Sequence, residues 1–558
     1  MKYIIIGAVA GGASTAARLR RLDEHAEIII FERGEYISYA NCGLPYYIGD
    51  VIKDRNRLFV QTAASFNRRF NIDVRTLTEV TQIDPKNRIV TAFKQSTGKV
   101  YTENYDKLVL SPGAEPIRPS LPGINSEGIF TLRNVRDTDV IKNYIGQNDV
   151  KTVVVIGAGF IGVEMAENFH HLGLQVTIIE MINQIMAPVD FPIAALMQQH
   201  IRSKGVQLRL NTTVTGFTRD ARGLGVTLKN GEILYADLVL LSIGVRPDTR
   251  LAEKAGLKIG AAHGIVVNEY LQTSDPDIYA VGDAIEFKNP ISGRSMITYL
   301  AGPANKQGRI CANNIVLGNS HSYHGSVNTA IVKVFDMTVA TTGMASKHLK
   351  AANIAHIVST NHAGSHASYF PGSRRMSIQI AFSPNNGRLL GAQIAGYKGV
   401  DKRIDILSSY IQQGRTIYDL AEFEHAYAPP YSSAKDPVNM AGFVAENILS
   451  NRLKVFYWHE LAGLKPGDLL LDVRNPDEFL SGSIPGAVNI PLDEIRARLP
   501  EIPTDKNIRI YCEAGLRGYL AQRILKQHGF DSVSNLSGGY VSWKACVAES
   551  ENEYHFVS

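Results

Sequence analysis

Short runs of apolar residues, mostly Ile, Val and Leu, recur along this 558-residue chain between glycine-containing turns and longer amphipathic stretches. Uninterrupted apolar runs of this kind are typical of strands that are buried on both faces of a parallel sheet. The pattern therefore predicts an α/β fold. The runs that define it are residues 2–6, 27–31, 108–110, 153–156, 175–179, 238–241, 278–281, 469–474 and 508–511.

The first two runs bracket a dinucleotide-binding fingerprint. Residues 7–12 (GAVAGG) predict a tight turn, residues 13–22 predict a helix, and Glu32 directly follows the second strand. In such a unit the glycines let the backbone approach a pyrophosphate, and the helix N-terminus stabilises its charge. The acidic residue accepts hydrogen bonds from ribose hydroxyls. Val9 stands where the middle glycine of GxGxxG belongs, so this copy alone is weak evidence.

A second, complete copy occurs at residues 157–162 (GAGFIG), and its second strand is followed by Glu180. Two bound dinucleotides are therefore expected, with a Rossmann-like unit that binds nothing as the alternative. A carboxylate at this position bonds a ribose 2′-hydroxyl and repels a 2′-phosphate. Residues 181–183 (MIN) offer no cation, so the sequence favours NADH over NADPH.

Two further segments, 108–114 (LVLSPGA) and 238–247 (LVLLSIGVRP), are apolar strands broken by a glycine turn. Such breaks are expected where the chain crosses between two nucleotide-binding domains. In residues 278–284 (IYAVGDA), Asp283 follows a strand and a glycine. It could bond the ribityl chain of a flavin, and a plain turn aspartate is the alternative.

Cys42 lies in the segment 38–46 (SYANCGLPY), where a redox ring bound at the first fingerprint could reach it. The chain has three other cysteines, all distant in sequence. Without a nearby second thiol, the oxidised form of Cys42 must be a sulfenic acid or a mixed disulfide with a small thiol. A small buried apolar residue is the alternative, but the context favours a redox nucleophile. Cys311 and Cys546 are expected to be structural.

These motifs together resemble the two-dinucleotide flavin disulfide reductases over residues 1 to about 445. In that family FAD occupies the first site, a nicotinamide the second, and a third domain forms a dimer interface. The segments 7–12 and 41–46 (NCGLPY) are similar to the coenzyme A-disulfide reductase branch, which has one redox cysteine. Peroxidases and oxidases of the group carry a histidine in the first glycine turn. Ala10 and its neighbours offer none, which disfavours peroxide or oxygen as the substrate.

The resemblance also implies the site residues. Tyr369 and Tyr427, in a segment similar to the dimerisation domain, would reach the partner subunit's active site and hold a leaving thiolate, with packing tyrosines as the alternative. Phe70 replaces a family lysine, for which Arg69 is a candidate substitute, and Asn305 replaces a family histidine. The implied coenzyme A contacts are Ser14, Arg18, Arg21, Ser38, Asn41 and Lys435. The implied cofactor contacts are Gly7, Ala10, Gly11, Gly12, Glu32, Arg33, Asn41, Ser111, Pro112, Gly113, Gly157, Gly159, Phe160, Ile161, Gly162, Glu180, Gly244, Gly282 and Asp283.

The strand pattern restarts after residue 451. A strand ends at Cys512, and the loop 512–518 (CEAGLRG) leads into a helix expected from Tyr519, while residues 478–487 read as a turn-rich loop. Such a loop aims backbone N–H groups and the helix dipole at the sulfur, which favours a thiolate or persulfide, and Arg517 adds a cation. This part resembles a single-domain rhodanese with Cys512 as the sulfur carrier. A thiol phosphatase is the alternative, which Glu513 disfavours because it would repel a phosphate dianion.

Composition narrows the class of protein. The formal net charge of +5 is mild and dispersed, which disfavours nucleic acid as a partner. The local basic cluster around Arg18 and Arg21 could meet a phosphorylated small molecule, or be a solvated helix face. There is no long apolar run, no signal-peptide pattern and no zinc-type cysteine pair. We therefore expect a cytoplasmic protein without a membrane segment or a metal.

The expected fold class is α/β: two Rossmann-like domains, an α+β dimerisation domain and a C-terminal rhodanese domain. The expected function is NADH-linked, FAD-dependent reduction of persulfides or polysulfides through Cys42 in a homodimer, releasing hydrosulfide. Coenzyme A persulfide is the expected substrate, and Cys512 would carry sulfane sulfur. The alternatives are a coenzyme A-disulfide reductase and a non-enzymatic thiol redox sensor. The expected domains are 1–115 with 246–324 (FAD), 116–245 (NAD(H)), 325–447 (dimerisation), 448–458 (linker) and 459–558 (rhodanese).

Overall fold

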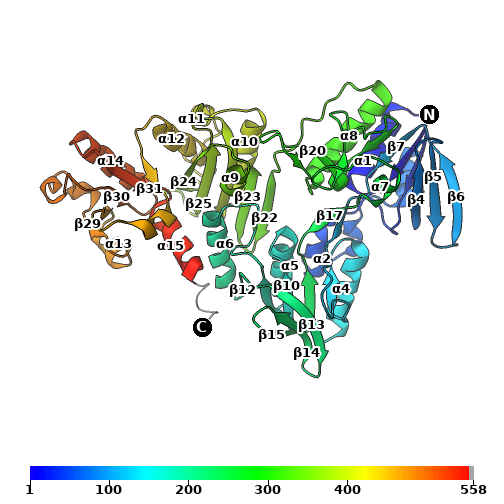
Figure 1. The fold of residues 1–558 in the computed structure, drawn as a ribbon, viewed down its shortest axis with the longest axis horizontal. Helices are drawn as coiled ribbons and strands as arrows, with labels where there is room; N and C mark the ends of the chain where they lie inside the picture. The colour runs from blue at the N-terminus through cyan, green and yellow to red at the C-terminus, as the bar shows by residue number, and fades with distance from the viewer. Residues whose placement is uncertain (552–558) are drawn as a thin grey trace. The chain divides into compact units, whose positions relative to one another are not determined.

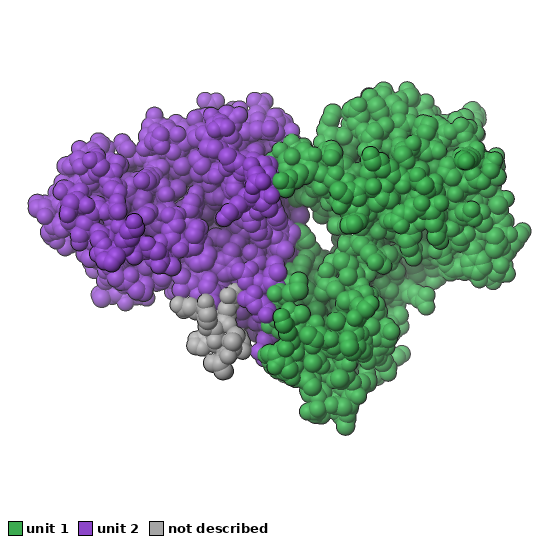
Figure 2. Space-filling model, viewed as in Figure 1, with its two compact units in different colours: residues 1–181, 212–328 green, residues 182–211, 329–558 purple. Residues whose placement is uncertain are grey.

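The computed structural model describes residues 1–551. The chain forms two compact units, shown in different colours in Figure 2. Unit 1 comprises residues 1–181 and 212–328, and unit 2 comprises residues 182–211 and 329–558. Each unit is built from two main sheets with their covering helices (Figure 1).

The first sheet of unit 1 is parallel and has the strand order β19-β7-β1-β2-β3. Its strands bury Ile, Val and Leu on both faces, as the uninterrupted apolar runs predict. Helix α1 packs closely against α8, and a Cβ on Gly308 would lie 2.6 Å from the carbonyl oxygen of Gly11. The bounds are β1 Lys2–Ile6, α1 Ala10–Leu22, β2 Glu27–Phe31, β3 Asp73–Arg75, β7 Lys107–Leu110, β19 Ile278–Ala280 and α8 Ala301–Leu317.

The second parallel sheet of unit 1 has the order β11-β10-β16-β9, and its core is shared with a three-stranded antiparallel sheet, β13-β14-β15. The bounds are β9 Ile129–Thr131, β10 Thr152–Ile156, α5 Phe160–His171, β11 Gln175–Ile179, β13 Val214–Asp220, β14 Gly223–Leu228, β15 Ile233–Ala236 and β16 Leu238–Leu241.

Smaller elements complete unit 1, including a second antiparallel sheet, β4-β5-β6. They are η1 Asn41–Gly43, α2 Leu44–Ile48, η2 Arg55–Leu58, α3 Ala63–Phe70, β4 Thr78–Asp84, β5 Ile89–Lys94, β6 Lys99–Asn104, β8 Ala114–Pro116, α4 Val135–Gln147, β17 Val245–Pro247, α7 Arg250–Lys254, β18 Ile265–Val266, η3 Gly282–Ala284, β20 Ile285–Lys288 and β21 Ser295–Met296.

Unit 2 contains a five-stranded antiparallel sheet with the order β22-β23-β26-β25-β24. Helix α10 packs on β23 and β26, and α12 packs on β24. The bounds are α6 Phe191–Ser203, β12 Gln207–Arg209, β22 Ala330–Val334, β23 Met337–Gly343, α9 Ser346–Ala351, β24 Ile357–Gly364, β25 Arg375–Phe382, β26 Leu389–Gly396, α10 Val400–Gln412, α11 Ile417–Glu422 and α12 Pro437–Leu449.

The second sheet of unit 2 is parallel, with the order β27-β31-β30-β28-β29. Figure 1 shows it at the C-terminal end of the ribbon, with α14 and α15 beside it. The bounds are β27 Val455–Phe456, η4 Trp458–Gly463, β28 Leu469–Asp472, α13 Pro476–Leu480, β29 Val488–Asn489, η5 Leu492–Glu494, η6 Leu499–Glu501, β30 Ile508–Tyr511, α14 Leu516–Gln527, β31 Val533–Leu536 and α15 Gly539–Glu551.

The predicted α/β class is confirmed, with three local corrections. Helix α1 begins at Ala10 instead of residue 13, and α14 begins at Leu516 instead of Tyr519, so Arg517 lies in the first turn of a helix. Part of the segment expected to be a turn-rich loop is the short helix α13. A capping box between Asn475 and Glu478 starts it.

His362, on β24, connects the two sheets of unit 2. Its Nε2 lies 2.9 Å from the carbonyl oxygen of Gly538 and 3.0 Å from Oγ of Ser542, and its Nδ1 lies 2.8 Å from Oγ of Ser377. A carbonyl oxygen can only accept, so Nε2 carries the proton and Nδ1 accepts from Ser377 in a neutral ring. Burial, with a contribution from nearby Arg375, lowers the pKa of His362 to about 4. The junction therefore requires an uncharged imidazole.

Acidification should destabilise unit 2 through His362. The pKa of an unfolded histidine is about 6.5. Between that pH and about 4, His362 is protonated in the unfolded chain but stays neutral in the folded chain. Stability is then lost as pH falls from about 6.5 to about 4, by up to about 3 kcal/mol. In His362→Gln, whose side-chain amide can still donate to the Gly538 carbonyl, melting temperatures measured across this range should fall less steeply.

His528→Gln is the matched control, because His528 is an exposed histidine of the same unit. Its melting temperature should follow the wild-type pH dependence. Identical slopes for the wild type and His362→Gln would contradict the role assigned to the buried ring.

Candidate functional site

The turn after β1 has no room for side chains. Gly7 adopts φ +96°, and a Cβ there would lie 2.0 Å from the carbonyl oxygen of Ser111. A Cβ on Gly12 would lie 1.9 Å from the carbonyl oxygen of Gly7. Both distances are far below van der Waals contact, so only glycine brings α1 this close to the strand ends. The N-terminus of α1 is thereby aimed at the space above the sheet, where a pyrophosphate would sit.

The second fingerprint repeats this geometry. Gly157 has φ +98°, and a Cβ on Gly162 would lie 2.0 Å from the carbonyl oxygen of Gly157. By contrast, nothing lies within 4 Å of a Cβ built on Gly159. Its counterpart Val9 has φ −98°, outside the left-handed region that favours glycine. The middle position of the fingerprint therefore does not require a positive φ in this chain.

The two predicted acidic residues occupy equivalent places. Oε2 of Glu32 accepts a hydrogen bond from the Ala8 amide at 2.9 Å, and Oε2 of Glu180 accepts from the Ala158 amide at 2.9 Å. Each carboxylate is thus held beside its glycine turn, where a ribose would meet it. Arg33, also predicted as a cofactor contact, forms ion pairs with Glu115 and Asp248.

Asp283 lies in η3, just beyond the end of β19. The Gly282 amide before it donates to Oε1 of Gln307 at 2.7 Å, which fixes this turn. Among the residues that the structure describes, none donates a hydrogen bond to the Asp283 carboxylate, and burial raises its pKa. A mostly buried carboxylate without a protein donor suits hydroxyl donors from a ligand. The residues around the first fingerprint therefore fit FAD, with its hydroxyl-bearing ribityl chain.

Cys42 lies in η1, directly before α2. The residue is exposed, yet the protein around its sulfur raises the pKa of the thiol through desolvation, followed by the charges of Glu164 and Asp283. The fold therefore brings the lone thiol close to the two predicted nucleotide-binding segments. The described part of the chain holds the Cys42 sulfur in a setting that disfavours the thiolate.

Sequence reasoning missed Glu164. This residue lies on α5, which packs against α2, and burial together with the charge of Glu167 raises its pKa to about 7. Burial, Glu164, Glu167 and Cys42 also raise the pKa of Tyr46 to about 12. The available signal was that Glu164 lies two positions after the complete fingerprint, but its proximity to Cys42 depends on helix packing.

The predicted coenzyme A contacts on α1 form a polar patch with α8. Oγ of Ser14 donates to Oδ1 of Asn305 at 2.5 Å, and Nε of Arg18 donates to Oδ1 of Asn313 at 2.9 Å. Slight desolvation and the neighbouring Arg309 and Arg21 lower the pKa of Arg18. Arg309 also belongs to this basic patch, and it was not among the predicted contacts.

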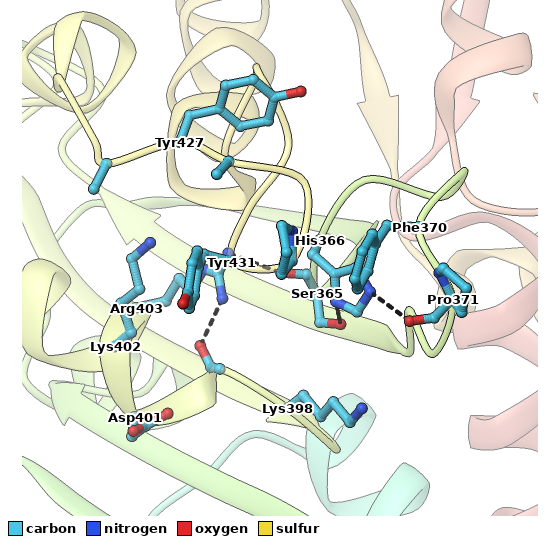
Figure 3. A pocket seen from close by; sticks show the side chains of 14 residues that line it. Ser365, His366, Phe370, Pro371, Lys398, Asp401, Lys402, Arg403, Tyr427 and Tyr431 are labelled. Carbon is cyan, nitrogen blue, oxygen red and sulfur yellow. Dashed lines mark hydrogen bonds between the residues drawn. The ribbon is translucent and has the colours of Figure 1, made fainter.

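Tyr369 and Tyr427 meet in unit 2, where their hydroxyl oxygens lie 2.7 Å apart. Both side chains are exposed. Tyr427 borders a pocket of about 580 Å³ whose lining includes Lys398, Lys402 and Tyr431 (Figure 3). Fifty-eight positions separate the two phenols in the sequence, so their pairing is a product of the tertiary fold.

Lys435, the coenzyme A contact predicted in unit 2, is exposed and directly precedes the buried Asp436. Asp436 accepts from Nη2 of Arg403 at 2.8 Å and caps the N-terminus of α12. Both of these partners are almost fully buried. The loop that carries Lys435 is therefore anchored at its C-terminal end.

Cys512 ends β30, and the loop that follows it is tightly specified. The Gly515 amide donates to Sγ of Cys512 at 3.1 Å, and Gly515 has φ +110°, which strongly favours glycine. The carbonyl of Gly515 in turn accepts from Nδ2 of Asn535 at 3.0 Å. The sulfur is thus held at the N-terminal end of α14, a setting that stabilises an anionic sulfur.

The other two cysteines are buried, and burial strongly raises the pKa of each thiol. Cys311 lies on α8 and Cys546 on α15, in agreement with structural roles. Among residues 1–551 no helix is long and apolar enough to span a membrane. Within the same range no group of three or more His, Cys, Asp or Glu side chains is placed to hold a metal ion.

Comparison with known proteins gives matches along almost the whole chain. Residues 1–308 match the pyridine nucleotide-disulphide oxidoreductases, residues 329–437 match the dimerisation domain of that family, and residues 458–546 match the rhodanese-like domain. A coenzyme A disulfide reductase of Staphylococcus aureus (strain JH9) is 36% identical over 445 residues, 80% of this chain and 100% of that protein.

Two solved structures extend the likeness to the C-terminal part. Reduced CoADR-RHD of Bacillus anthracis has a TM-score of 0.96 and 47% identity, and the match covers 98% of each chain. A NAD-dependent persulfide reductase from A. fulgidus has a TM-score of 0.91 and 38% identity, covering 97% of this chain and 100% of that one.

The chain therefore belongs to the pyridine nucleotide-disulphide oxidoreductase family of enzymes. Within it, the chain is similar to coenzyme A disulfide reductases and to a NAD-dependent persulfide reductase, and it carries a C-terminal rhodanese-like domain. The resemblance inferred from sequence is confirmed. Membership implies FAD and NAD(P)H as cofactors and FAD-dependent reduction of a disulfide or persulfide.

Removing the Asp283 carboxylate should weaken flavin binding. A hydrogen bond to a charged group contributes about 1.5 to 3 kcal/mol, so Asp283→Asn should raise the Kd for FAD by about tenfold to a hundredfold. The measurement is the flavin absorbance that remains bound after extensive dialysis, together with titration of FAD into stripped protein. Asp149→Asn, an exposed aspartate of the same unit, should bind FAD as the wild type does. Full flavin retention in Asp283→Asn would contradict the role of this carboxylate.

Proposed function

We propose that this enzyme uses NADH to reduce persulfides, with coenzyme A persulfide as the substrate, through Cys42, and that Cys512 carries sulfane sulfur. The observation that carries the proposal is the presence of two separate thiols in different chemical settings. Cys42 is a lone thiol close to Asp283, and Cys512 lies in a loop that stabilises an anionic sulfur. A disulfide reductase alone would not need the second thiol.

Coenzyme A is supported by the basic patch formed by Arg18, Arg21 and Arg309. Three guanidinium groups suit the phosphates of a nucleotide-bearing thiol, since guanidinium pairs well with phosphate oxygens. The relative from S. aureus is named for coenzyme A disulfide. Ser14, Ser38, Asn41 and Lys435 are proposed as further contacts.

NADH is supported by Glu180. Its carboxylate lies beside the second glycine turn, where it would accept from a ribose 2′-hydroxyl and repel a 2′-phosphate. Met181, directly after it, is exposed and offers no positive charge. We also propose that the other residues predicted from the resemblance as cofactor contacts bind FAD or the nicotinamide nucleotide.

The proposed chemistry at Cys42 is thiol exchange followed by reduction. The Cys42 thiolate attacks the inner sulfur of the persulfide R–S–SH, a Cys42–S–S–R bond forms, and hydrosulfide leaves with the electron pair of the broken bond. When bound, FAD supplies the two-electron link between NADH and this mixed disulfide. Two electrons and a proton then return Cys42 to the thiolate and release R–SH.

The Cys42 thiolate needs stabilisation beyond what its own surroundings provide, because they raise the pKa of the thiol. We assign this role to the bound flavin and to Tyr369 and Tyr427 of the partner subunit in a homodimer. A pair of phenols already hydrogen-bonded to each other can donate to a thiolate that forms or leaves nearby. The match to a dimerisation domain supports the homodimer.

Two other functions make different predictions. A coenzyme A-disulfide reductase would turn over the symmetrical disulfide faster than the persulfide. A thiol redox sensor would show slow or no steady-state NADH consumption, which the complete second fingerprint disfavours. Anaerobic NADH oxidation with coenzyme A persulfide, coenzyme A disulfide and polysulfide, with hydrosulfide measured directly, separates all three.

Cys42→Ser should abolish turnover while keeping the flavin. A hydroxyl cannot form the mixed disulfide, so NADH-linked hydrosulfide release should fall on the order of a thousandfold or more. Bound flavin, read from the visible spectrum, should be unchanged, because serine is nearly isosteric and Cys42 is not a proposed FAD contact. Turnover that survives in Cys42→Ser would refute the proposed route.

Replacing the Glu180 carboxylate should shift the nicotinamide preference. In Glu180→Ser combined with Met181→Arg, the kcat/KM for NADH should fall about tenfold through loss of a charged hydrogen bond. The kcat/KM for NADPH should rise, because the 2′-phosphate meets a cation instead of a carboxylate. The measurement is kcat/KM for both nucleotides with one sulfur substrate. An unchanged ratio of the two values would contradict the assignment of Glu180.

A further inference from the structure

The sulfur-carrier loop around Cys512 is surrounded by arginines, but each of them is matched by a carboxylate. Arg517, in the first turn of α14, donates through Nη1 and Nη2 to the two oxygens of Glu478, both at 2.6 Å. This fork holds the pKa of Glu478 at about 2. The pair therefore stays ionised at any pH at which the enzyme works, and its charges cancel locally.

The second pairing lies inside the loop itself. The carboxylate of Glu513, the residue after Cys512, is 3.6 Å from Nη2 of Arg375 and 3.5 Å from Nη1 of Arg474. The backbone carbonyl of Glu513 accepts from the Val541 amide at 3.1 Å, which fixes the position of the residue. A negative charge is thus built into the loop beside the sulfur.

The third pairing lies beneath the loop. Arg474 is 2% exposed, pairs with the fully buried Asp472 at 2.7 Å, and stacks with its guanidinium carbon 4.1 Å from the centre of the Tyr540 ring. Asp472 therefore already neutralises the charge of Arg474, without any contribution from Glu513. The guanidinium groups of Arg375, Arg474 and Arg517 around the loop therefore face three carboxylates, those of Asp472, Glu478 and Glu513.

The remaining groups that can stabilise an anion are the Gly515 amide and the N-terminus of α14, and both point at the Cys512 sulfur. The Gly515 amide donates to Sγ of Cys512, and the dipole of α14 is equivalent to roughly half a positive charge at this end. This suffices for one thiolate or persulfide. A donor that brings two further negative charges would meet no excess of cations and would approach the Glu513 carboxylate.

We propose that the Cys512 loop selects persulfide donors, whose sulfane sulfur carries at most one charge, over dianionic donors of the thiosulfate type, and that Glu478 and Glu513 set this specificity. The inference rests on the proposed role of Cys512 as a sulfur carrier. In the favoured step the Cys512 thiolate attacks the outer sulfur of R–S–SH. The new Cys512–S–S⁻ bond forms, the bond to the carrier breaks, and R–SH leaves with its electron pair and the proton.

The test uses the full-length protein, cyanide as the sulfur acceptor, and two donors: thiosulfate and the uncharged carrier 2-mercaptoethanol persulfide. Cyanide takes the outer sulfur as thiocyanate and regenerates the thiolate, and thiocyanate is measured against a blank without enzyme. The wild type should favour the persulfide by at least about tenfold in kcat/KM. Comparable kcat/KM values for the two donors would overturn the proposal.

Glu478→Gln and Glu513→Gln should each raise kcat/KM for thiosulfate by about tenfold, because a guanidinium loses its partner next to the sulfur. Values for 2-mercaptoethanol persulfide should stay within about twofold. Glu494→Gln is the matched control, since it removes a carboxylate paired with Arg498 in the same domain and should change neither value. A thiosulfate-to-persulfide ratio unchanged by both loop variants would overturn the proposal.

Two further measurements separate the possible failures. Cys512→Ser should abolish transfer from both donors, and transfer that persists would refute the sulfur-carrier role itself. If the loop variants fail to fold, the dependence of the wild-type kcat/KM for thiosulfate on salt concentration tests the proposal instead. A neutral loop predicts that kcat/KM for thiosulfate changes less than about twofold between about 0.05 and 0.5 M salt, whereas a steep decline would overturn the proposal.

Discussion

The absence of space at the two glycine turns is the constraint on which the site in unit 1 depends. Because Gly12 and Gly162 lie almost in contact with the carbonyls of Gly7 and Gly157, each helix starts directly above the carboxyl end of its strand. The carboxyl ends of β1, β7 and β19 meet at one edge of the first sheet, which is where open α/β sheets bind ligands. Ser111 and Asp283 follow two of those strands. Cys42 lies near Asp283 at this edge, which is where the proposed redox thiol would meet a bound flavin.

Sequence reasoning succeeded where structure is local. The strands, the fingerprints and the loop after Cys512 are encoded by contiguous apolar runs and glycines, so β1, β2, β11 and β30 have the predicted bounds. The start of α14 was wrong by three residues, because the positive φ of Gly515 permits the helix to begin directly after it. Glu164 beside Cys42 and the Arg375–Glu513 contact could not be predicted. Each joins segments far apart in the sequence through packing that leaves no periodic signal.

The hairpin β24–β25 links the two chemistries proposed for unit 2. His362 on β24 bonds to Gly538 and Ser542, Arg375 at the start of β25 faces Glu513, and the connection between these strands carries Tyr369. One hairpin thus contacts the rhodanese-like domain through both of its strands, and the connection between the strands carries a phenol. The loop that follows Cys512 therefore contacts the segment that matches the dimerisation domain.

In the proposed reaction, electrons reach the substrate through the sulfur of Cys42. The most direct measurement is mass spectrometry of the Cys42 peptide after rapid acid quenching of the enzyme during anaerobic turnover with coenzyme A persulfide and limiting NADH. We expect a disulfide-linked coenzyme A adduct on Cys42 that disappears when NADH is added in excess. An unmodified Cys42 throughout turnover, with hydrosulfide still released, would contradict it.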